Sequence, residues 1–339
     1  MSVSKRQRAC PMLLPTQMRL LQIVAPGRAE WREAPVPVPG PGEVLVRIRA
    51  IATCPHWDLH IFGGQPMFPG APLDYPYLPG QPGHEAVGEI VALGPEVTSL
   101  RVGASVAVWR DTGRRPQGCY AQFNVLRADD LLEVPAHLPA AALASLELAM
   151  CVEVSFQQLA TLGGVAGRRL GLSGLGPAGL VAVQLARAHG AAEIIGFDVV
   201  AERRALASRL GAHRTLAPDA VTWPPARDDS ALDDAIDLTG LPASIEFLMD
   251  RTRRCVTLFG VLREDVHFKP RHLFGPGLVL MGYGEHHRTA AETALRFIVA
   301  GQLQLAPLIT HTLPFTRYAE GVELLRTKQA VKILFDPWL

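Results

Sequence analysis

The stretch that most constrains this chain is a glycine-rich turn at residues 174–179, which reads Gly-Leu-Gly-Pro-Ala-Gly. A short, mostly apolar segment at 169–173 precedes the turn and predicts a β-strand. Residues 180–187 have helical composition, and 192–198 read as a second strand that ends in an acid, Asp198. Strand, glycine turn, helix, strand and acid in this order are typical of a dinucleotide-binding unit.

Each glycine of the turn has its own predicted role in holding a dinucleotide. Gly174 allows the tight turn, Gly176 lets the backbone approach a pyrophosphate, and Gly179 lets the helix and strand pack closely. The helix that begins around Pro177 presents free N–H groups to the phosphates. The turn therefore predicts a bound cofactor that carries a pyrophosphate.

Asp198 indicates which dinucleotide is bound. A carboxylate at the end of the second strand accepts hydrogen bonds from ribose hydroxyls and repels a 2′-phosphate, which favours NAD over NADP. Arg203 and Arg204 follow closely and weaken this preference, or lie on a solvated helix face.

The rest of the chain predicts a β-rich domain interrupted by a doubly wound α/β domain. At 339 residues, two domains are expected. Residues 18–60 read as β structure with a rigid proline-rich connection at 34–42, 62–82 as a long aromatic loop, and 83–125 as short strands typical of a barrel. Helical composition begins near 140, and strand–helix alternation follows. We expect a flexible tail at 1–17, a catalytic domain at 18–153 and 295–339, and a cofactor domain at 154–294.

Composition excludes several classes of protein. The formal net charge of +1 gives no electrostatic basis for binding nucleic acid or an anionic membrane. No apolar run reaches the roughly 18 residues that span a bilayer, and no secretory signal is expected. The five cysteines are scattered and form no paired motif, which predicts a reducing, cytoplasmic location.

The chain resembles the medium-chain dehydrogenase/reductase family, in its zinc-dependent alcohol and polyol dehydrogenase branch. The resemblance covers roughly residues 18–339 and depends on Gly-His-Glu at 83–85, Gly88, the turn at Gly94, the fingerprint at 174–179 and Ala-Val-Lys at 330–332. It implies a GroES-like β-barrel catalytic domain with an inserted Rossmann domain, and an active site in the cleft between them. It also places Thr239, Gly260 and Val261 near the ribose and nicotinamide.

The resemblance further implies a catalytic zinc held by Cys54, His84 and a third ligand. Thiolate, imidazole and carboxylate are ordinary zinc ligands, and three protein ligands with one open position form a catalytic site. The third ligand is Glu147, which we favour, or Cys151, four residues further on. Glu85 is expected behind the metal or as an alternate ligand.

Residues 54–60 depart from the family pattern. The family places a Ser or Thr two residues after the cysteine, and this hydroxyl relays the alcohol proton. Here His56 replaces it, and the segment is one residue longer. An imidazole can relay a proton near neutral pH, so we expect His56 and His60 to form the path, the alternative being that His56 packs or faces solvent.

Two further features concern metals. The region 109–120 contains one cysteine, Cys119, where many relatives carry four, so we expect one catalytic ion and no structural ion. Glu285, His286 and His287 follow the last predicted strand of the cofactor domain, and we expect these side chains to lie on a solvated loop.

The sequence therefore predicts a cytoplasmic, zinc- and NAD-dependent dehydrogenase that acts on a secondary alcohol or polyol, or on the corresponding ketone. The first alternative is a zinc-free quinone or enoyl reductase of the same family, and the second is a non-catalytic nucleotide-binding protein. The family resemblance implies a homodimer or homotetramer that pairs through strand edges near 275–285.

Overall fold

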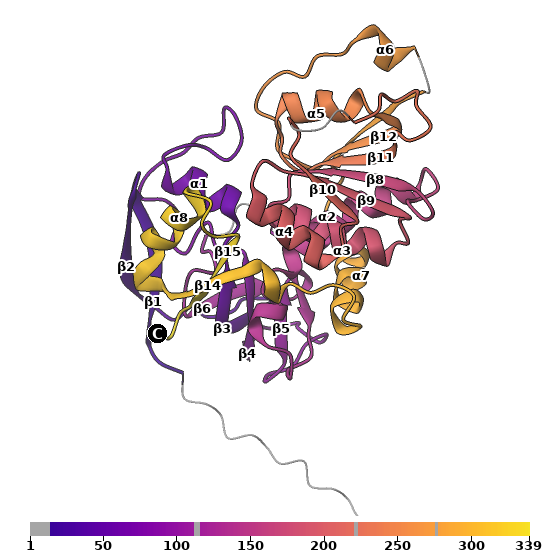
Figure 1. The fold of residues 1–339 in the computed structure, drawn as a ribbon. Coiled ribbons are helices and arrows are strands. Elements are labelled where there is room, and N and C mark those ends of the chain that lie inside the picture. Colours follow the sequence, from indigo (N-terminus) through magenta and orange to yellow (C-terminus); the bar gives the residue numbers. More distant parts are fainter. Residues whose placement is uncertain (1–13, 112–115, 220–222, 275–276) are drawn as a thin grey trace, which may run out of the picture.

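The computed structural model describes residues 14–111, 116–219, 223–274 and 277–339, arranged as two sheet-based units (Figure 1). The described strands are β1 (Gln17–Ala25), β2 (Arg28–Pro35), β3 (Glu43–Ala52), β4 (Glu85–Leu93), β5 (Ser105–Val108), β6 (Phe123–Arg127), β7 (Leu131–Glu133), β8 (Arg169–Ser173), β9 (Glu193–Phe197), β10 (Arg214–Leu216), β11 (Leu232–Asp237), β12 (Thr252–Leu258), β13 (Val279–Gly282), β14 (Ile309–Pro314) and β15 (Lys332–Asp336). The α-helices are α1 (Pro55–Phe62), α2 (Leu146–Ala160), α3 (Pro177–Ala188), α4 (Ala201–Leu210), α5 (Pro242–Met249), α6 (Pro270–Leu273), α7 (Arg288–Val299) and α8 (Tyr318–Arg326).

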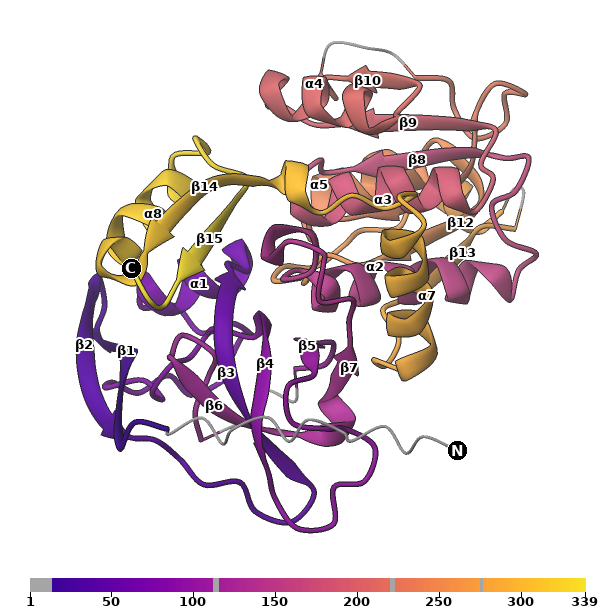
Figure 2. The same cartoon turned by 90° about the horizontal axis from the view of Figure 1, so that it is seen from below.

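The first unit joins both ends of the described chain. Its main sheet has the order β14-β15-β3-β4-β5-β7, with β6 also paired to β3, and β1 and β2 form a separate antiparallel pair. Strand β15 pairs antiparallel with β3 and parallel with β14. Figure 2 shows the C-terminal β14, β15 and α8 in yellow beside the indigo N-terminal strands. The C-terminal segment thus returns to the first unit, as predicted.

The second unit is a six-stranded sheet whose pairs are all parallel, in the order β10-β9-β8-β11-β12-β13. Counted along the chain from β8, this is the order 3-2-1-4-5-6 of the doubly wound dinucleotide-binding fold. In such a sheet, ligands bind outside the carboxyl ends of the strands where the order reverses, which here is at β8 and β11. The sheet therefore presents the glycine turn after β8 at the expected cofactor edge.

The predicted domain limits stay predictions. The limits at 153/154 and 294/295 fall inside α2 and α7. One continuous hydrophobic core contains residues of both helices, of the parallel sheet and of barrel strands. Of the predicted tail at 1–17, residues 1–13 lie outside the described residues.

Helix α2 is a core helix that contributes site residues at its first turns. Within the described residues, the stretch Ala140–Ala160 is long and apolar enough to cross a membrane by length and composition, but 78% of its most apolar window is buried inside the protein. Glu147 and Glu153 interrupt it and are themselves buried. A largely buried apolar stretch and buried acids within it are both typical of a core helix in a globular protein.

The prediction of β structure throughout 18–60 is wrong at its end, where α1 forms. Pro55 occupies the first turn of this helix, where its missing N–H and fixed φ are favourable. The backbone N–H of Asp58 donates to the carbonyl of Cys54. Strand β2 lies mostly in the predicted β structure, but it also includes Ala34 and Pro35 of the expected proline-rich connection.

Candidate active site

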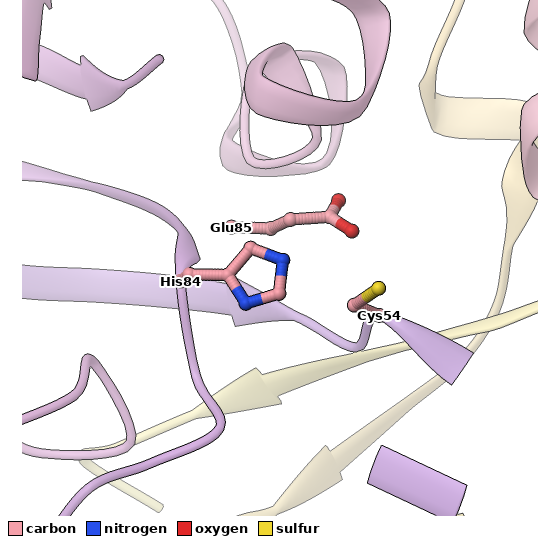
Figure 3. Close-up of side chains that lie close together, drawn as sticks. All are labelled: Cys54, His84 and Glu85. Atoms are coloured by element: carbon pink, nitrogen blue, oxygen red, sulfur yellow. The ribbon is translucent and has the colours of Figure 1, made fainter. Parts of the chain in front are cut away.

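Three metal-binding side chains converge where β3 ends and β4 begins. Cys54 is the N-cap of α1, His84 directly precedes β4, and Glu85 is the first residue of β4. One ligand atom from each lies within 4.8 Å of the others, and Figure 3 shows the three side chains together. The antiparallel pairing of Ala52 in β3 with Glu85 in β4 creates this proximity, because it places the two strand ends side by side.

His84 is fixed in the tautomer that a metal requires. Its Nδ1 lies 2.8 Å from the carbonyl oxygen of Pro82, and a carbonyl can only accept, so Nδ1 carries a proton and Nε2 is the nitrogen available to a metal, which would displace any proton there. Burial lowers the pKa of His84, but hydrogen bonding to Cys54 and the charges of Glu147 and Asp111 outweigh burial and raise this pKa well above its usual value. The surroundings therefore favour a cation at this point.

Glu85 is held from behind by a buried lysine. The Nζ of Lys332, in β15, donates to both carboxylate oxygens at 2.7 and 2.6 Å, and both side chains are buried. The ion pair compensates the charge of Glu85 and fixes its carboxylate beside the Cys54–His84 pair. This arrangement suits the predicted position behind a metal.

Both predicted candidates for the third ligand lie in the first turns of α2. The Oε2 of Glu147 is 3.8 Å from Nε2 of His84, and its Oε1 accepts from the thiol of Cys151 at 3.2 Å. Burial raises the pKa of Glu147 to about 7, against the charge of His84, which lowers it. Burial and then the charge of Glu147 raise the pKa of the Cys151 thiol. Of the two, Glu147 is the one whose side chain faces His84.

The prediction that the 285–287 segment is solvated is wrong for the side chain of His286. This side chain is partly buried, and its Nε2 lies 3.4 Å from Sγ of Cys151. Glu147, Cys151 and His286 form a second group whose ligand atoms all lie within 4.8 Å of one another. The sequence signal was the run Glu285, His286, His287, which we interpreted as a solvated loop because it follows the last strand of the parallel sheet.

His56 and His60 stack on each other along α1. Their ring centroids are 4.4 Å apart with an interplanar angle of 13°, and Nδ1 of His60 donates to the carbonyl of His56 at 2.6 Å. The Nε2 of His56 is buried and has no hydrogen-bond partner among the described residues. Burial, then His60 and Arg263, lower the pKa of His56 to about 4, so this ring is neutral at physiological pH.

Arg263, which follows β12 in the cofactor unit, contacts the aromatic loop at 62–82 of the first unit. Its guanidinium donates to the carbonyl of Pro66 at 3.1 Å and to that of Met67. Trp57 makes edge contacts with Phe68 of this loop and with His84. The loop thus connects the metal-binding group to the cofactor unit. Phe68, which contacts Trp57 next to His84, is half exposed.

Asp58 is a buried acid on the inner face of α1. Its Oδ1 accepts from the hydroxyls of Tyr120 and Tyr318, each at 2.8 Å, whereas Oδ2 has no hydrogen-bond partner. Burial raises the pKa of Asp58 from 3.8 to about 6, although both tyrosine hydrogen bonds act in the opposite direction. The folded protein therefore holds the proton on Asp58 more tightly than the unfolded chain does.

We expect Asp58→Asn to stabilise the zinc-free protein above pH 6 by up to about 3 kcal/mol, the free energy that corresponds to the pKa shift. Because the folded pKa lies above the unfolded one, wild-type stability from this group is present below pH 3.8 and lost as pH rises to about 6. Asparagine keeps an Oδ1 acceptor for both tyrosines. Urea unfolding between pH 4.5 and 7.5 measures the difference, and a variant that loses stability relative to wild type as pH rises contradicts it.

The glycine turn has the geometry that a dinucleotide requires. Gly174 has φ +90°, and a Cβ at Gly179 would lie 1.9 Å from the carbonyl oxygen of Gly174. A Cβ at Gly176, the N-cap of α3, would meet only the Nη1 of Arg203, at 3.9 Å. Pro177 then begins α3. The N-terminus of this helix is therefore open to a phosphate, with a guanidinium beside it.

Asp198 fixes the turn from the end of β9. One carboxylate oxygen accepts from the backbone N–H of Leu175 at 2.7 Å and the other from that of Val200 at 2.8 Å. Arg204 donates to the Asp198 carbonyl, whereas the buried Nε of Arg203 has no hydrogen-bond partner in the described part of the chain. Of the two arginines, Arg203 is thus the one with an unpaired donor near the turn.

The ends of β11 and β12 meet closely at the same sheet edge. Asp237 accepts from Thr239 and from the backbone N–H of Gly240. Gly240 has φ +69°, and a Cβ there would lie 2.3 Å from the carbonyl oxygen of Val261. A Cβ at Gly260 would lie 2.0 Å from the nitrogen of Gly240. The structure thus places Thr239, Gly260 and Val261 at one edge, beside the glycine turn.

A zinc-type alcohol dehydrogenase is the class of protein that this fold and this donor set define. Residues 40–136 match the family model of the alcohol dehydrogenase GroES-like domain, and 177–300 match that of the zinc-binding dehydrogenases. The chain belongs to the medium-chain dehydrogenase/reductase family, in its zinc-dependent branch. This confirms the predicted fold class, and it supports zinc and a nicotinamide dinucleotide as cofactors.

Particular relatives extend over nearly the whole chain. L-threonine 3-dehydrogenase of Pyrococcus furiosus is 28% identical over 340 residues, covering 91% of this chain and 94% of that protein. The structure of galactitol-1-phosphate dehydrogenase from Escherichia coli matches with a TM-score of 0.82 at 23% identity and covers 94% of this chain and 100% of its own. Acetophenone reductase of Geotrichum candidum in complex with NAD matches with a TM-score of 0.78 at 21% identity and covers 95% and 98%.

Proposed function

We propose that this protein is an NAD-dependent dehydrogenase that interconverts a secondary alcohol and a ketone at one zinc ion. The observation that carries the proposal is the set of donors around His84. Its Nε2 lies 3.8 Å from Oε2 of Glu147, and Cys54 lies beside it. This thiolate, imidazole and carboxylate set fits a catalytic zinc with an open fourth position.

Cys54, His84 and Glu147 would hold the ion, which supplies a Lewis acid that lowers the pKa of the alcohol. Glu85, already paired with Lys332, holds a fixed negative charge behind the ligands. Cys151 is the weaker candidate for third ligand, because its thiol is protonated by burial and contacts Glu147 rather than His84.

The cofactor edge of the parallel sheet would hold NAD, which accepts the hydride. The open N-terminus of α3 at Gly176 suits the pyrophosphate, and Arg203 brings an unpaired donor to the same place. The carboxylate of Asp198 at the end of β9 disfavours a 2′-phosphate. We therefore propose NAD rather than NADP as the preferred cofactor.

His56 and His60 would carry the alcohol proton away from the site. Among the described residues the Nε2 of His56 has no hydrogen-bond partner, and because its pKa is about 4 the ring would pass a proton on rather than hold it. His60, whose ring stacks on His56, is the proposed next group of the path. This path takes the place of the hydroxyl relay of the family.

The proposal also covers the number of metal ions, the cellular location and the oligomeric state. We propose a single catalytic ion without a structural one, a cytoplasmic location, and a homodimer or homotetramer. Strand β13 is the edge of the parallel sheet, with Val279 and Phe274 exposed nearby. An open edge with apolar neighbours suits pairing with a second copy.

Purified protein incubated with NAD and a panel of secondary alcohols, polyols and 3-hydroxy amino acids should form NADH, and it should use NADP poorly. Removing zinc with a chelator should abolish turnover, and added zinc should restore it. Full turnover without metal contradicts the zinc mechanism and favours a zinc-free reductase. Tight NADH binding with no turnover of any substrate favours a non-catalytic nucleotide-binding protein.

A further inference from the structure

A polar cavity of about 300 Å³ lies at the ends of α3 and α4 that face away from the cofactor edge. Arg187 lines it from the last turn of α3, and a rise of about 1.5 Å per residue puts roughly 16 Å of helix between Arg187 and Gly176. Arg209 lines it from the last turn of α4, and the segment after α7 completes its wall. The cavity is therefore separate from the glycine turn and from the metal-binding group.

The guanidinium groups of Arg187 and Arg209 have no counterion in the described part of the chain. Neither forms an ion pair with a described residue or donates a hydrogen bond to one, and none of the described residues that line the cavity is acidic. Arg169 of the same unit, by contrast, is paired with Glu193 at 2.6 Å. Two neighbouring cations without a carboxylate partner attract an anion from solution, and guanidinium groups bind phosphate and carboxylate oxygens in a bidentate manner.

The ends of the helices do not cancel this positive charge. A helix C-terminus carries roughly half a negative charge, which favours an arginine in the last turn of α3 and of α4. Three such partial charges, from α3, α4 and α7, remain smaller than two full guanidinium charges. The cavity therefore keeps a net positive charge that the helix ends alone do not explain.

Gly211 brings the two arginines together. It is the C-cap of α4, close behind Arg209, and has φ +112°. A Cβ at Gly211 would lie 2.5 Å from Nη1 of Arg187, so the guanidinium of Arg187 lies directly over the backbone there. Because Gly211 has no side chain, an arginine from α3 can lie beside the end of α4 that carries Arg209.

The wall formed by the segment after α7 is held in place by a buried glutamine. Nε2 of Gln184, in α3, donates to the carbonyl of Gln304 at 3.0 Å, and Oε1 of Gln184 accepts from the backbone N–H of Gln304 at 2.8 Å. Residues 301–304 lead from α7 towards β14, so the chain returns through this segment from the cofactor unit to the first unit (Figure 2). A ligand in the cavity would contact both the cofactor unit and this connection.

We propose that this cavity is an anion site that binds one small dianion through Arg187 and Arg209, with the side-chain amide of Gln302 as a further donor. Its volume lies at the lower end of the range of small-molecule sites, which fits a phosphate ester or a dicarboxylate of a few carbon atoms. The bound anion fastens residues 301–304 to the ends of α3 and α4. The site does not depend on which alcohol is oxidised.

Isothermal titration calorimetry of the zinc-loaded protein with saturating NADH tests this site, because NADH keeps the probe away from the glycine turn. The probes are inorganic phosphate, glycerol phosphate and malonate, at one ionic strength set with chloride. We expect one saturable site per chain. Arg187→Gln, Arg209→Gln and Gln302→Glu, which places a negative charge in the cavity, should each weaken binding about tenfold or more. Arg326→Gln is the matched control and should leave the affinity unchanged, because this arginine in the last turn of α8 is paired with Glu323.

The relative affinities of the probes identify the group that the site recognises. Tighter binding of phosphate and its ester assigns the site to phosphate oxygens, tighter binding of malonate assigns it to a dicarboxylate, and either result supports the proposal. It is overturned if no probe binds saturably, or if binding survives Arg187→Gln combined with Arg209→Gln. The substituted side chains are exposed, so these variants should keep the circular dichroism spectrum of the wild type. A protein without dehydrogenase activity would count against the proposed function and leave the titration valid.

Discussion

His84→Asn should remove zinc from the protein and lower kcat/KM for alcohol oxidation by about a thousandfold or more, since a Lewis-acidic ion contributes several kcal/mol to such a reaction. The imidazole Nε2 is the donor that faces Glu147, and its tautomer is fixed by Pro82. An asparagine at this position cannot replace a neutral imidazole ligand. Metal analysis and steady-state kinetics measure the two effects.

His56→Asn is the matched control for this prediction. His56 lies on α1 beside the metal group but outside it, so this variant should keep its zinc and lose turnover mainly through slower proton transfer. An active, metal-free His84→Asn protein would contradict the assignment of His84 as a zinc ligand. Equal zinc loss in both variants would show that the site fails for structural reasons.

Lys332→Met should destabilise the protein by about 3–5 kcal/mol, because it leaves the charge of Glu85 buried without compensation. Both carboxylate oxygens of Glu85 accept from this one ammonium group, and both side chains are fully or nearly fully buried. Urea unfolding of zinc-free protein at neutral pH measures the loss.

Two further variants make this prediction specific. Lys328→Met changes an exposed lysine four residues earlier and should alter stability by less than about 0.5 kcal/mol. The double variant Glu85→Gln with Lys332→Met removes both charges and should recover much of the stability. A Lys332→Met protein as stable as wild type would show that Glu85 is neutral or compensated by another group.

The glycine turn could be predicted because its signal is local. Gly174, Gly176, Gly179 and Asp198 lie within a stretch of 25 residues, and the backbone conformation of each is dictated by its immediate neighbours. The structure places them as expected, with φ +90° at Gly174 and an open N-cap at Gly176. The same holds for Cys54 and His84, which the family pattern predicted to lie together.

What escaped prediction depends on contacts between distant residues or on short elements. Helix α1 has eight residues, too few for a clear periodic pattern, and it starts from a proline that is also common in extended segments. Glu85 and Lys332 are 247 residues apart, and Cys151 and His286 are 135 apart. No sequence period connects such pairs, because tertiary packing alone brings them together.

The ion pair between Glu85 and Lys332 also sets the order in which the active site can be completed during protein synthesis. Cys54, His84 and Glu147 are synthesised well before Lys332. Lys332 and strand β15, which pairs with β3, are synthesised much later than these three residues. Until then, the charge of Glu85 has no buried partner, and the strand end beside Cys54 lacks its neighbour. Stable capture of zinc should therefore follow the synthesis of β15 rather than that of the ligands themselves.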